Sequence, residues 1–188
     1  MPTPSPAVFH PAEGGAAPLP GARGKGMTME IREIQASEFD LIWPIFRAVV
    51  AAGDTYAYDP AIAVEAARAL WTTPPCRAFA ASEGDRVVGC YMLHPNQAGP
   101  GDHVANAGYM VAPEARGRGI AGRLCEHSLD VARAAGFPAM QFNAVVACNG
   151  PAVHLWQKHG FAIVGRVPQA FRHPAHGLTD LLVMHRFL

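Results

Sequence analysis

Apolar and polar positions along residues 29–188 follow two different periods, and stretches of the two kinds alternate. Stretches with a period near two predict strands, and stretches whose apolar residues lie three and four positions apart predict helices. The predicted strands are 29–33, 77–82, 86–93, 104–111, 139–145, 161–167 and 181–187. The predicted helices are 37–51, 59–71, 117–134 and 151–159. This order predicts an α/β or α+β layer fold, in which helices cover the faces of a mixed sheet.

The ends of the predicted helices carry residues that are typical of helix ends. Ser37 is a good N-cap for the first helix, and Pro60 suits the first turn of the second. Gly53 and Gly136 follow the first and third helices, where glycine commonly stops a helix. The first helix then has one apolar stripe, made of Phe39, Ile42, Ile45, Phe46 and Val49.

Residues 1–27 differ in composition from the rest of the chain. They contain prolines at positions 2, 4, 6, 11, 18 and 20, several glycines and few large apolar side chains. Such a segment buries too little apolar surface to offset the entropy lost on ordering it. We therefore expect a disordered leader over 1–27 and one folded domain over 28–188.

The composition narrows the class of protein. Half of the 188 residues are hydrophobic, and fifteen basic residues balance fifteen acidic ones. This balance argues against a nucleic-acid-binding protein and against a polybasic membrane-surface protein. No apolar run approaches the roughly 18 residues of a membrane span. The four cysteines form no CxxC pair, so we expect reduced core or cleft thiols in a cytoplasmic protein (Cys76, Cys90, Cys125 and Cys148).

A glycine-rich turn connects the strand 104–111 to the helix 117–134. Gly117, Gly119 and Gly122 let the backbone approach a ligand closely, and a helix N-terminus carries about half a positive charge. Arg116, Arg118 and Arg123 surround the turn with cations. These features predict an anion site, although an ordinary glycine-rich helix start has the same pattern. The turn lacks the GK[ST] ending of a Walker loop and the context of a dinucleotide-binding GxGxxG.

Three segments together resemble the GCN5-related N-acetyltransferase (GNAT) family. They are R-G-R-G-I-A at 116–121, M-V-A-P at 110–113 and N-G-P-A-V-H-L-W-Q-K-H-G-F at 149–161. The resemblance covers about residues 29–188. It implies a mixed, mostly antiparallel sheet of about seven strands with about four helices. It also implies an acetyl-CoA-dependent N-acetyltransferase that transfers acetyl directly to an amine and needs no metal. A homodimer is a further expectation from the resemblance.

The resemblance assigns the cofactor to particular positions. The turn would hold the pyrophosphate of acetyl-CoA, mainly through main-chain N–H groups, while Gly122 allows close helix packing. The strand end would pair with the pantetheine arm, with the Val111 N–H as donor to the thioester oxygen. Asn149 would contact the arm, or cap the next helix, or both. The implied cofactor residues are Met110, Val111, Arg116, Gly117, Arg118, Gly119, Ile120, Ala121, Gly122, Asn149 and Trp156.

Two positions depart from the family's usual catalytic residues. Trp156 stands where the family usually has a tyrosine that protonates the leaving thiolate, and an indole supplies no such proton. Ala105 stands where some relatives have a glutamate base. The remaining catalytic candidates are His103, Asn106, Tyr109 and Asn149, with a water relay as an alternative. The family's fourth strand commonly has a bulge, so the sequence does not say which of them face the cleft.

The acceptor side is predicted at the loop between the first two helices. Asp54 or Asp59 would attract an ammonium group, and Tyr56 or Tyr58 would wall the site, although a capped aromatic connector explains the loop equally well. The loop loosely resembles that of acetyltransferases for small amino acids and cyclic proline analogues, which implies a small-molecule amine substrate. His173 and His176 have metal-like spacing, but no cysteine or carboxylate pattern lies near them in sequence, so we expect no metal.

Two other functions fit the same motifs. The missing Glu and Tyr favour a non-catalytic acyl-CoA-binding or regulatory module. Acetylation of protein N-termini or lysines is the other alternative, although the chain has no acidic surplus for binding basic protein substrates.

Overall fold

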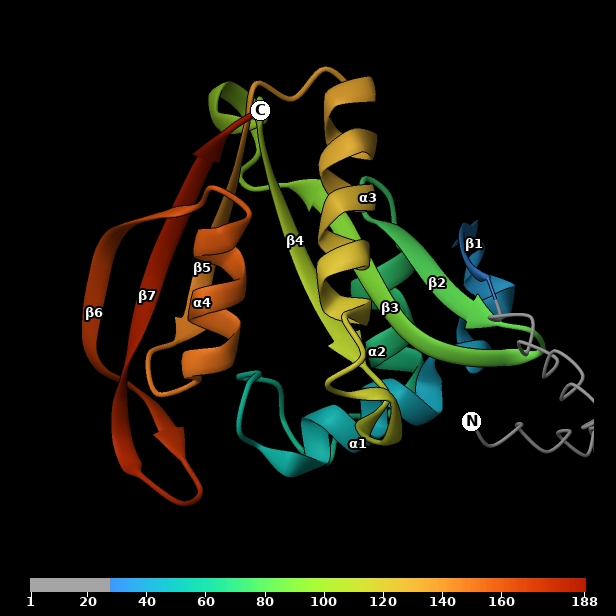
Figure 1. The fold of residues 1–188 in the computed structure, drawn as a ribbon, viewed down its shortest axis with the longest axis horizontal. Coiled ribbons are helices and arrows are strands. Elements are labelled where there is room, and N and C mark those ends of the chain that lie inside the picture. The colour runs from blue at the N-terminus through green and yellow to red at the C-terminus, as the bar shows by residue number, and fades with distance from the viewer. Residues whose placement is uncertain (1–27) are drawn as a thin grey trace, which may run out of the picture.

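A seven-stranded sheet runs through residues 28–188, the part of the chain that the computed structural model describes (Figure 1). Its strands are β1 (Met29–Ile34), β2 (Arg77–Glu83), β3 (Arg86–Pro95), β4 (Val104–Val111), β5 (Ala139–Val146), β6 (Ala162–His173) and β7 (Gly177–Phe187). Their spatial order is β1-β2-β3-β4-β5-β7-β6, and every neighbouring pair is antiparallel except β4 and β5. The predicted mixed, mostly antiparallel sheet is confirmed. The predicted leader, 1–27, lies outside the described residues.

Helices cover both faces of the sheet. Within residues 28–188 they are α1 (Trp43–Ala52), α2 (Val64–Thr72), α3 (Ile120–Ala134) and α4 (Gly150–Lys158), with short 3-10 helices η1 (Ala36–Leu41), η2 (Gly99–Gly101) and η3 (Pro113–Ala115). Figure 1 shows α3 in front of β3 and β4, with α2 behind them. The side chains agree, because Tyr109 of β4 contacts Ser128 of α3, whereas the adjacent Gly108 faces Tyr56 of the α1–α2 connection.

Three helices begin later than the sequence predicted. The first stretch is η1 followed by α1, which starts at Trp43 because Pro44 lacks an N–H and fits only a first turn. The N-cap of η1 is Gln35, which forms a capping box with Glu38, and the predicted cap Ser37 lies inside this 3-10 helix. Asp59 accepts a hydrogen bond from the Ala61 N–H in a turn, so α2 begins only at Val64. Likewise α3 begins at Ile120, because the two glycines before it have left-handed backbones. The predicted apolar stripe of the first helix is buried throughout.

The last two strands are longer than predicted. Instead of ending near residue 167, β6 continues to His173 and pairs with β7 again after an irregularity between Val167 and Phe171. A tight turn at Gly177, with φ of +67°, closes this hairpin. Most side chains of β6 are exposed, so its outer half lacks the apolar alternation on which the sequence prediction relied.

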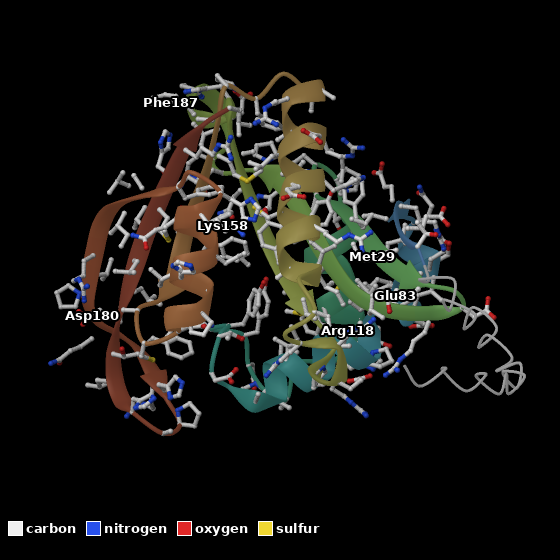
Figure 2. The ribbon with its side chains drawn as sticks, in the orientation of Figure 1. Met29, Glu83, Arg118, Lys158, Asp180 and Phe187 are labelled. Carbon is white, nitrogen blue, oxygen red and sulfur yellow. The ribbon has the colours of Figure 1, made fainter. Side chains whose placement is uncertain are left out.

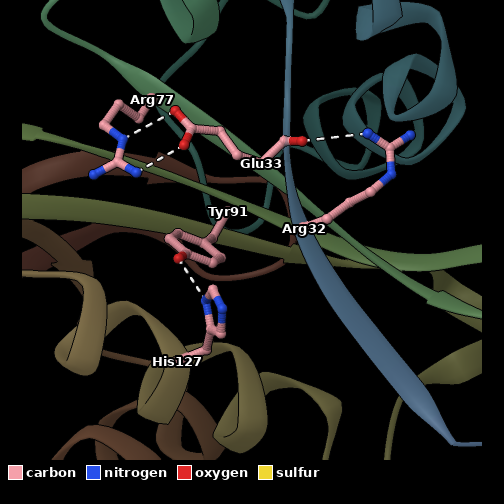
Figure 3. A network of polar contacts seen from close by, with 5 residues as sticks. All are labelled: Arg32, Glu33, Arg77, Tyr91 and His127. Atoms are coloured by element: carbon pink, nitrogen blue, oxygen red, sulfur yellow. Dashed lines mark hydrogen bonds and ion pairs between the residues drawn. The ribbon is translucent and has the colours of Figure 1, made fainter.

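A network of polar contacts joins the first strands to α3 (Figure 3). Arg77 donates to both carboxylate oxygens of Glu33, at 2.9 and 2.7 Å, and links β2 to β1. The Tyr91 hydroxyl lies 2.8 Å from Nδ1 of His127, which fastens β3 to α3. Burial lowers the pKa of His127, while Asp130 acts weakly in the opposite direction. This arrangement holds α3, and with it the turn that precedes it, against the sheet.

The two parallel strands β4 and β5 pair only at their beginnings and then diverge. Their only pairs are Val104↔Ala139 and Ala105↔Met140. Beyond Ala105, β4 continues to Val111 without a strand beside it on that side, and β5 continues to Val146. The divergence leaves a gap in the middle of the sheet, which positions the site described next.

Candidate active site

A cavity of about 750 Å³ occupies the gap between β4 and β5. This volume is in the range of small-molecule and cofactor sites. Residues from both diverging strands, from the α1–α2 connection, from the turn before α3 and from the start of α4 line it. They include Asp54, Thr55, Tyr56, Tyr58, Met92, His94, Asn106, Tyr109, Met110, Val111, Arg116, Asn143, Cys148, Asn149, Trp156 and His173.

The open edge of β4 presents main-chain groups to this cavity. The β3–β4 register is unbroken from Gly89↔Val111 to Pro95↔Ala105, so the bulge expected for this strand is absent. The Ala112 N–H donates to the Val88 carbonyl oxygen at 3.0 Å, toward β3. Because successive residues of a strand point their N–H groups in opposite directions, the Val111 N–H points away from β3, to the open side. The carbonyl of Tyr109 points the same way and accepts from the Tyr56 hydroxyl at 2.9 Å.

The turn before α3 is a row of unused donors. Gly117 and Gly119 have φ values of +74° and +77°, and a Cβ on either glycine would meet nothing within 4 Å. None of the N–H groups from Gly117 to Gly122 donates a hydrogen bond to a residue that the structure describes. Free N–H groups at the start of a fifteen-residue helix favour an anion. The pyrophosphate site at this turn stays a prediction, which these unused donors support.

The three arginines around the turn play different parts. Only the Arg116 side chain lines the cavity. Arg118 forms an ion pair with Glu83 at 2.6 Å, and both residues are labelled in Figure 2. Arg123 donates a hydrogen bond to the main-chain oxygen of Met29 at 3.4 Å. The side chains of Arg118 and Arg123 thus already have partners, while the Arg118 N–H remains in the row of donors.

Close packing holds this turn against its neighbours. A Cβ on Gly89 of β3 would lie 3.1 Å from the side chains of Ile120 and Leu124 and from the Met110 carbonyl oxygen. A Cβ on Gly122 would lie 3.4 Å from Nε2 of His159, just after α4. These two glycines therefore let α3 lie close to the sheet and to α4.

Asn149 caps α4 and also lines the cavity. Its Oδ1 accepts the Ala152 N–H at 3.2 Å. Since the oxygen is used by the cap, the Nδ2 amide is the end left for a ligand. Both sequence interpretations of Asn149 are thus compatible with one geometry.

Aromatic rings form the inner wall of the cavity. Trp156 lies 4.9 Å from the Tyr109 ring and 5.1 Å from the Phe142 ring, measured between centroids. The Tyr109 hydroxyl lies 2.7 Å from Oγ of Ser128, inside the layer between β4 and α3. Burial raises the pKa of Tyr109 well above its usual value. The Tyr109 hydroxyl is therefore a packing group, and the structure does not support it as a catalytic candidate.

His103 does not belong to the cavity, contrary to its place among the catalytic candidates. It lies in the exposed turn before β4, and its Nδ1 is 3.2 Å from the Pro100 carbonyl oxygen. Asn106 does line the cavity, where its Nδ2 donates to Oδ1 of Asn96 at 2.9 Å. Asn143 of β5 donates to the same oxygen at 2.6 Å. This amide cluster joins β3, β4 and β5 where the gap begins.

The α1–α2 connection forms the opposite wall. Tyr56 and Tyr58 stack at 5.3 Å, and Tyr58 stacks in turn on Phe46. Oδ1 of Asp54 and Oγ1 of Thr55 are buried and have no hydrogen-bond partner among the described residues. An unpartnered buried oxygen is costly unless a ligand or water supplies a donor. The predicted acceptor-side residues thus share a cavity with the predicted cofactor residues.

Family comparison agrees with this geometry. The family model described as "Acetyltransferase (GNAT) family" matches residues 31–161. The chain belongs to the GNAT acetyltransferase family. Its members are acyltransferases, so the fold and the enzyme class expected from the sequence are confirmed.

Individual relatives of this GNAT chain agree with the match. N-acetyltransferase aca1 of Schizosaccharomyces pombe is 32% identical over 98 residues, which are 52% of this chain and 47% of that protein. The chain thus spans about half the length of that curated relative. A GCN5-related N-acetyltransferase from Kribbella flavida is 48% identical, with a TM-score of 0.81 over 85% of this chain and 98% of that one. A phosphinothricin acetyltransferase from Sinorhizobium meliloti, solved in complex with AcCoA, shares the fold at 22% identity and a TM-score of 0.75, over 86% and 89% of the two chains.

Two residues of this GNAT site were missed by sequence reasoning. His94 of β3 lines the cavity, and its register partner on β4 is Asn106. Its Nδ1 lies 2.7 Å from the Pro95 carbonyl oxygen, which can only accept, so Nδ1 carries the proton and Nε2 is an acceptor in the neutral ring. Asn143 was missed as well. Strand register decides both placements, and neither residue belongs to a motif.

The cysteines of the GNAT domain are all free thiols among the described residues. Cys90 and Cys125 are buried, and burial raises the pKa of Cys125 to about 12. Cys148, in contrast, is exposed and lines the cavity, so it is a cleft thiol and not a core thiol. Cys148 also lies beside His173 and His176, a proximity in space that their separation in sequence did not indicate. Within residues 28–188, no helix has the length and apolar character needed to cross a membrane.

Proposed function

We propose that this protein transfers the acetyl group of acetyl-CoA directly to the amine of a small molecule. The observation that carries the proposal is one continuous cavity, which joins the open edge of β4 to a buried, unpartnered carboxylate oxygen at Asp54. The row of unused N–H groups lies just beyond the end of β4. A diphosphate needs convergent donors, an amide-bearing arm suits an open strand edge, and an ammonium group needs a counter-charge.

In the proposed complex, main-chain groups hold the cofactor. The N–H groups of residues 117–121 bind the pyrophosphate, with Arg116 as the nearby cation. The pantetheine arm lies along β4 at Met110 and Val111, and the Asn149 amide donates to it. The Val111 N–H donates to the thioester oxygen and stabilises the negative charge that develops on it in the tetrahedral intermediate. Trp156 packs against the arm.

The acceptor amine approaches from the α1–α2 connection. The Asp54 carboxylate attracts the ammonium form, and the stacked rings of Tyr56 and Tyr58 limit the size of the acceptor. Direct transfer needs both reactants in one cleft, which supplies much of the rate through proximity.

His94 is the proposed general base in place of the missing glutamate. Its proton is held on Nδ1, so Nε2 can take the proton that the attacking amine releases. The amine nitrogen forms a bond to the thioester carbon, the carbon–sulfur bond breaks, and the thiolate takes a proton from water. Asn106, beside His94 in the register, orients the acceptor. None of these steps uses a metal.

Two further proposals come from the surface and the composition. The edge strand β6 exposes Ile163, Val164 and Val167, which supports a homodimer formed through this side of the sheet.

The balanced charge and the reduced cysteines support a cytoplasmic protein without nucleic-acid or membrane partners.

The acceptor assignment is tested with a matched pair of carboxylates from one connection. Asp54→Asn removes the charge in the cavity, and Asp59→Asn removes one in a surface turn outside it. We expect KM for the amine to rise about 10- to 100-fold in Asp54→Asn, the loss of one charge-assisted hydrogen bond, and to stay unchanged in Asp59→Asn. Equal KM values in all three proteins, over a panel of amino acids, proline analogues, polyamines and peptides, would refute the assignment.

A further inference from the structure

Three metal-ligating side chains meet at the rim of the cavity. They are Cys148, in the loop between β5 and α4, and His173 and His176, at the turn of the β6–β7 hairpin. One ligand atom from each lies within 4.8 Å of the other two. Cys148 and His173 also line the cavity, opposite the α1–α2 connection.

We propose that these three side chains bind a zinc-like transition-metal ion, and that the bound ion inhibits acetyl transfer. Thiolate and imidazole are the preferred protein ligands of Zn²⁺. In a tetrahedral site with ordinary zinc bond lengths, the ligand atoms lie about 3.3–3.6 Å apart. Since the three atoms lie within 4.8 Å of one another, each pair needs to close by at most about 1.5 Å.

The local structure allows this closure. His176 and Cys148 are exposed, and the two imidazole rings already lie 4.6 Å apart, measured between centroids. Nδ1 of His173 accepts the Ala175 N–H at 3.1 Å, and metal binding through either ring nitrogen would give up this bond. A single neutral hydrogen bond in an exposed turn contributes little to the stability of the fold.

Three protein ligands leave one tetrahedral position open, as in zinc sites that bind water or substrate. The ion would tie the tip of the β6–β7 hairpin to the loop that carries Asn149, across one wall of the cavity. The ion and its fourth ligand would therefore obstruct the acceptor. This inhibition rests on the proposed acetyl transfer, whereas metal binding does not.

Metal binding is tested with Co²⁺ as a spectroscopic probe and with Zn²⁺ in competition with a chromophoric chelator. For the unmodified protein we expect tetrahedral cobalt bands and a thiolate-to-cobalt charge-transfer band. Cys148→Ser should lose the charge-transfer band, and His176→Ala should weaken Zn²⁺ affinity at least about a hundredfold. Matched controls are Cys76→Ser and His154→Ala, which remove a thiol and a surface histidine outside the cluster and should leave both signals unchanged.

The inhibition is tested separately, as the ratio of acetylation rates with and without Zn²⁺ in each protein. The ratio should fall in the unmodified protein and in His154→Ala, recover with a chelator, and stay near one in His176→Ala. Absence of the charge-transfer band, or its persistence in Cys148→Ser, would overturn the metal site even if acetylation is active. Zn²⁺ binding with an unchanged rate ratio would overturn the inhibition alone, and absence of acetylation would count against the proposed function instead.

Discussion

Replacement of Gly119 by valine tests the row of main-chain donors, because this glycine has a left-handed backbone and lies among those donors. Gly119 precedes α3 with φ of +77°, and within residues 28–188 no heavy atom beyond its two chain neighbours lies within 4 Å of the position that its Cβ would take. A valine side chain there would fill the space in front of the N–H groups without clashing with the protein.

Gly136 supplies the control. It has φ of +84° just after α3 and also faces open space. The fifteen-residue helix places it about 22 Å from Gly119. A non-glycine residue in this backbone region costs about 1–2 kcal/mol, so Gly119→Val and Gly136→Val should lose similar free energies of unfolding.

Affinity for acetyl-CoA separates the two variants. Hydrogen bonds to a charged group contribute about 1.5–3 kcal/mol each, so the loss of two to the pyrophosphate weakens binding at least a hundredfold. Calorimetric titration should show this loss in Gly119→Val and near-normal affinity in Gly136→Val, with urea unfolding to compare stabilities. Equal affinities in the two variants would show that the N–H groups around Gly119 do not bind the pyrophosphate.

Three further changes test neighbouring parts of the structure. Asn149→Ala should lower the free energy of unfolding by about 1 kcal/mol and weaken acetyl-CoA binding about fivefold. Asn149→Asp should restore the stability but not the affinity. Full recovery of affinity in the aspartate variant would show that the residue acts only as a helix cap. Trp156→Phe should keep kcat within its order of magnitude at saturating substrates, because the ring acts by packing, and a far larger drop would point to chemistry at the indole N–H. Burial lowers the pKa of His127, so the unfolded chain binds this proton more readily. The free energy of unfolding should therefore fall as pH drops below about 6.5, more steeply than in His127→Gln, and parallel curves would contradict this.

The sequence predicted the sheet well because the strands alternate clearly, and it predicted the turn before α3 because glycines mark it directly. The helix starts were wrong where a local device overrides the periodic pattern, as Pro44 and the Asp59 turn do. The outer half of β6 was missed because an exposed edge strand carries little alternation.

The sequence did not predict the contacts between residues that only strand register brings together. His94 faces the cavity because it pairs with Asn106, and Cys148 meets His173 because β5, β7 and β6 are neighbours in the sheet. No spacing along the chain encodes these contacts. In contrast, His103 was a catalytic candidate because it lies close in sequence to the motif at the end of β4. It lies in the exposed turn before that strand, and this position does not support a catalytic role.

The most direct test of acetyl transfer is to measure free CoA thiol and N-acetylated amine in the same reaction, by thiol titration and mass spectrometry. We expect equal amounts of both products, formed only when an amine of one chemical class is present. Thiol release without acetylated amine, or acetyl-CoA binding without either product across the amine panel, would contradict it.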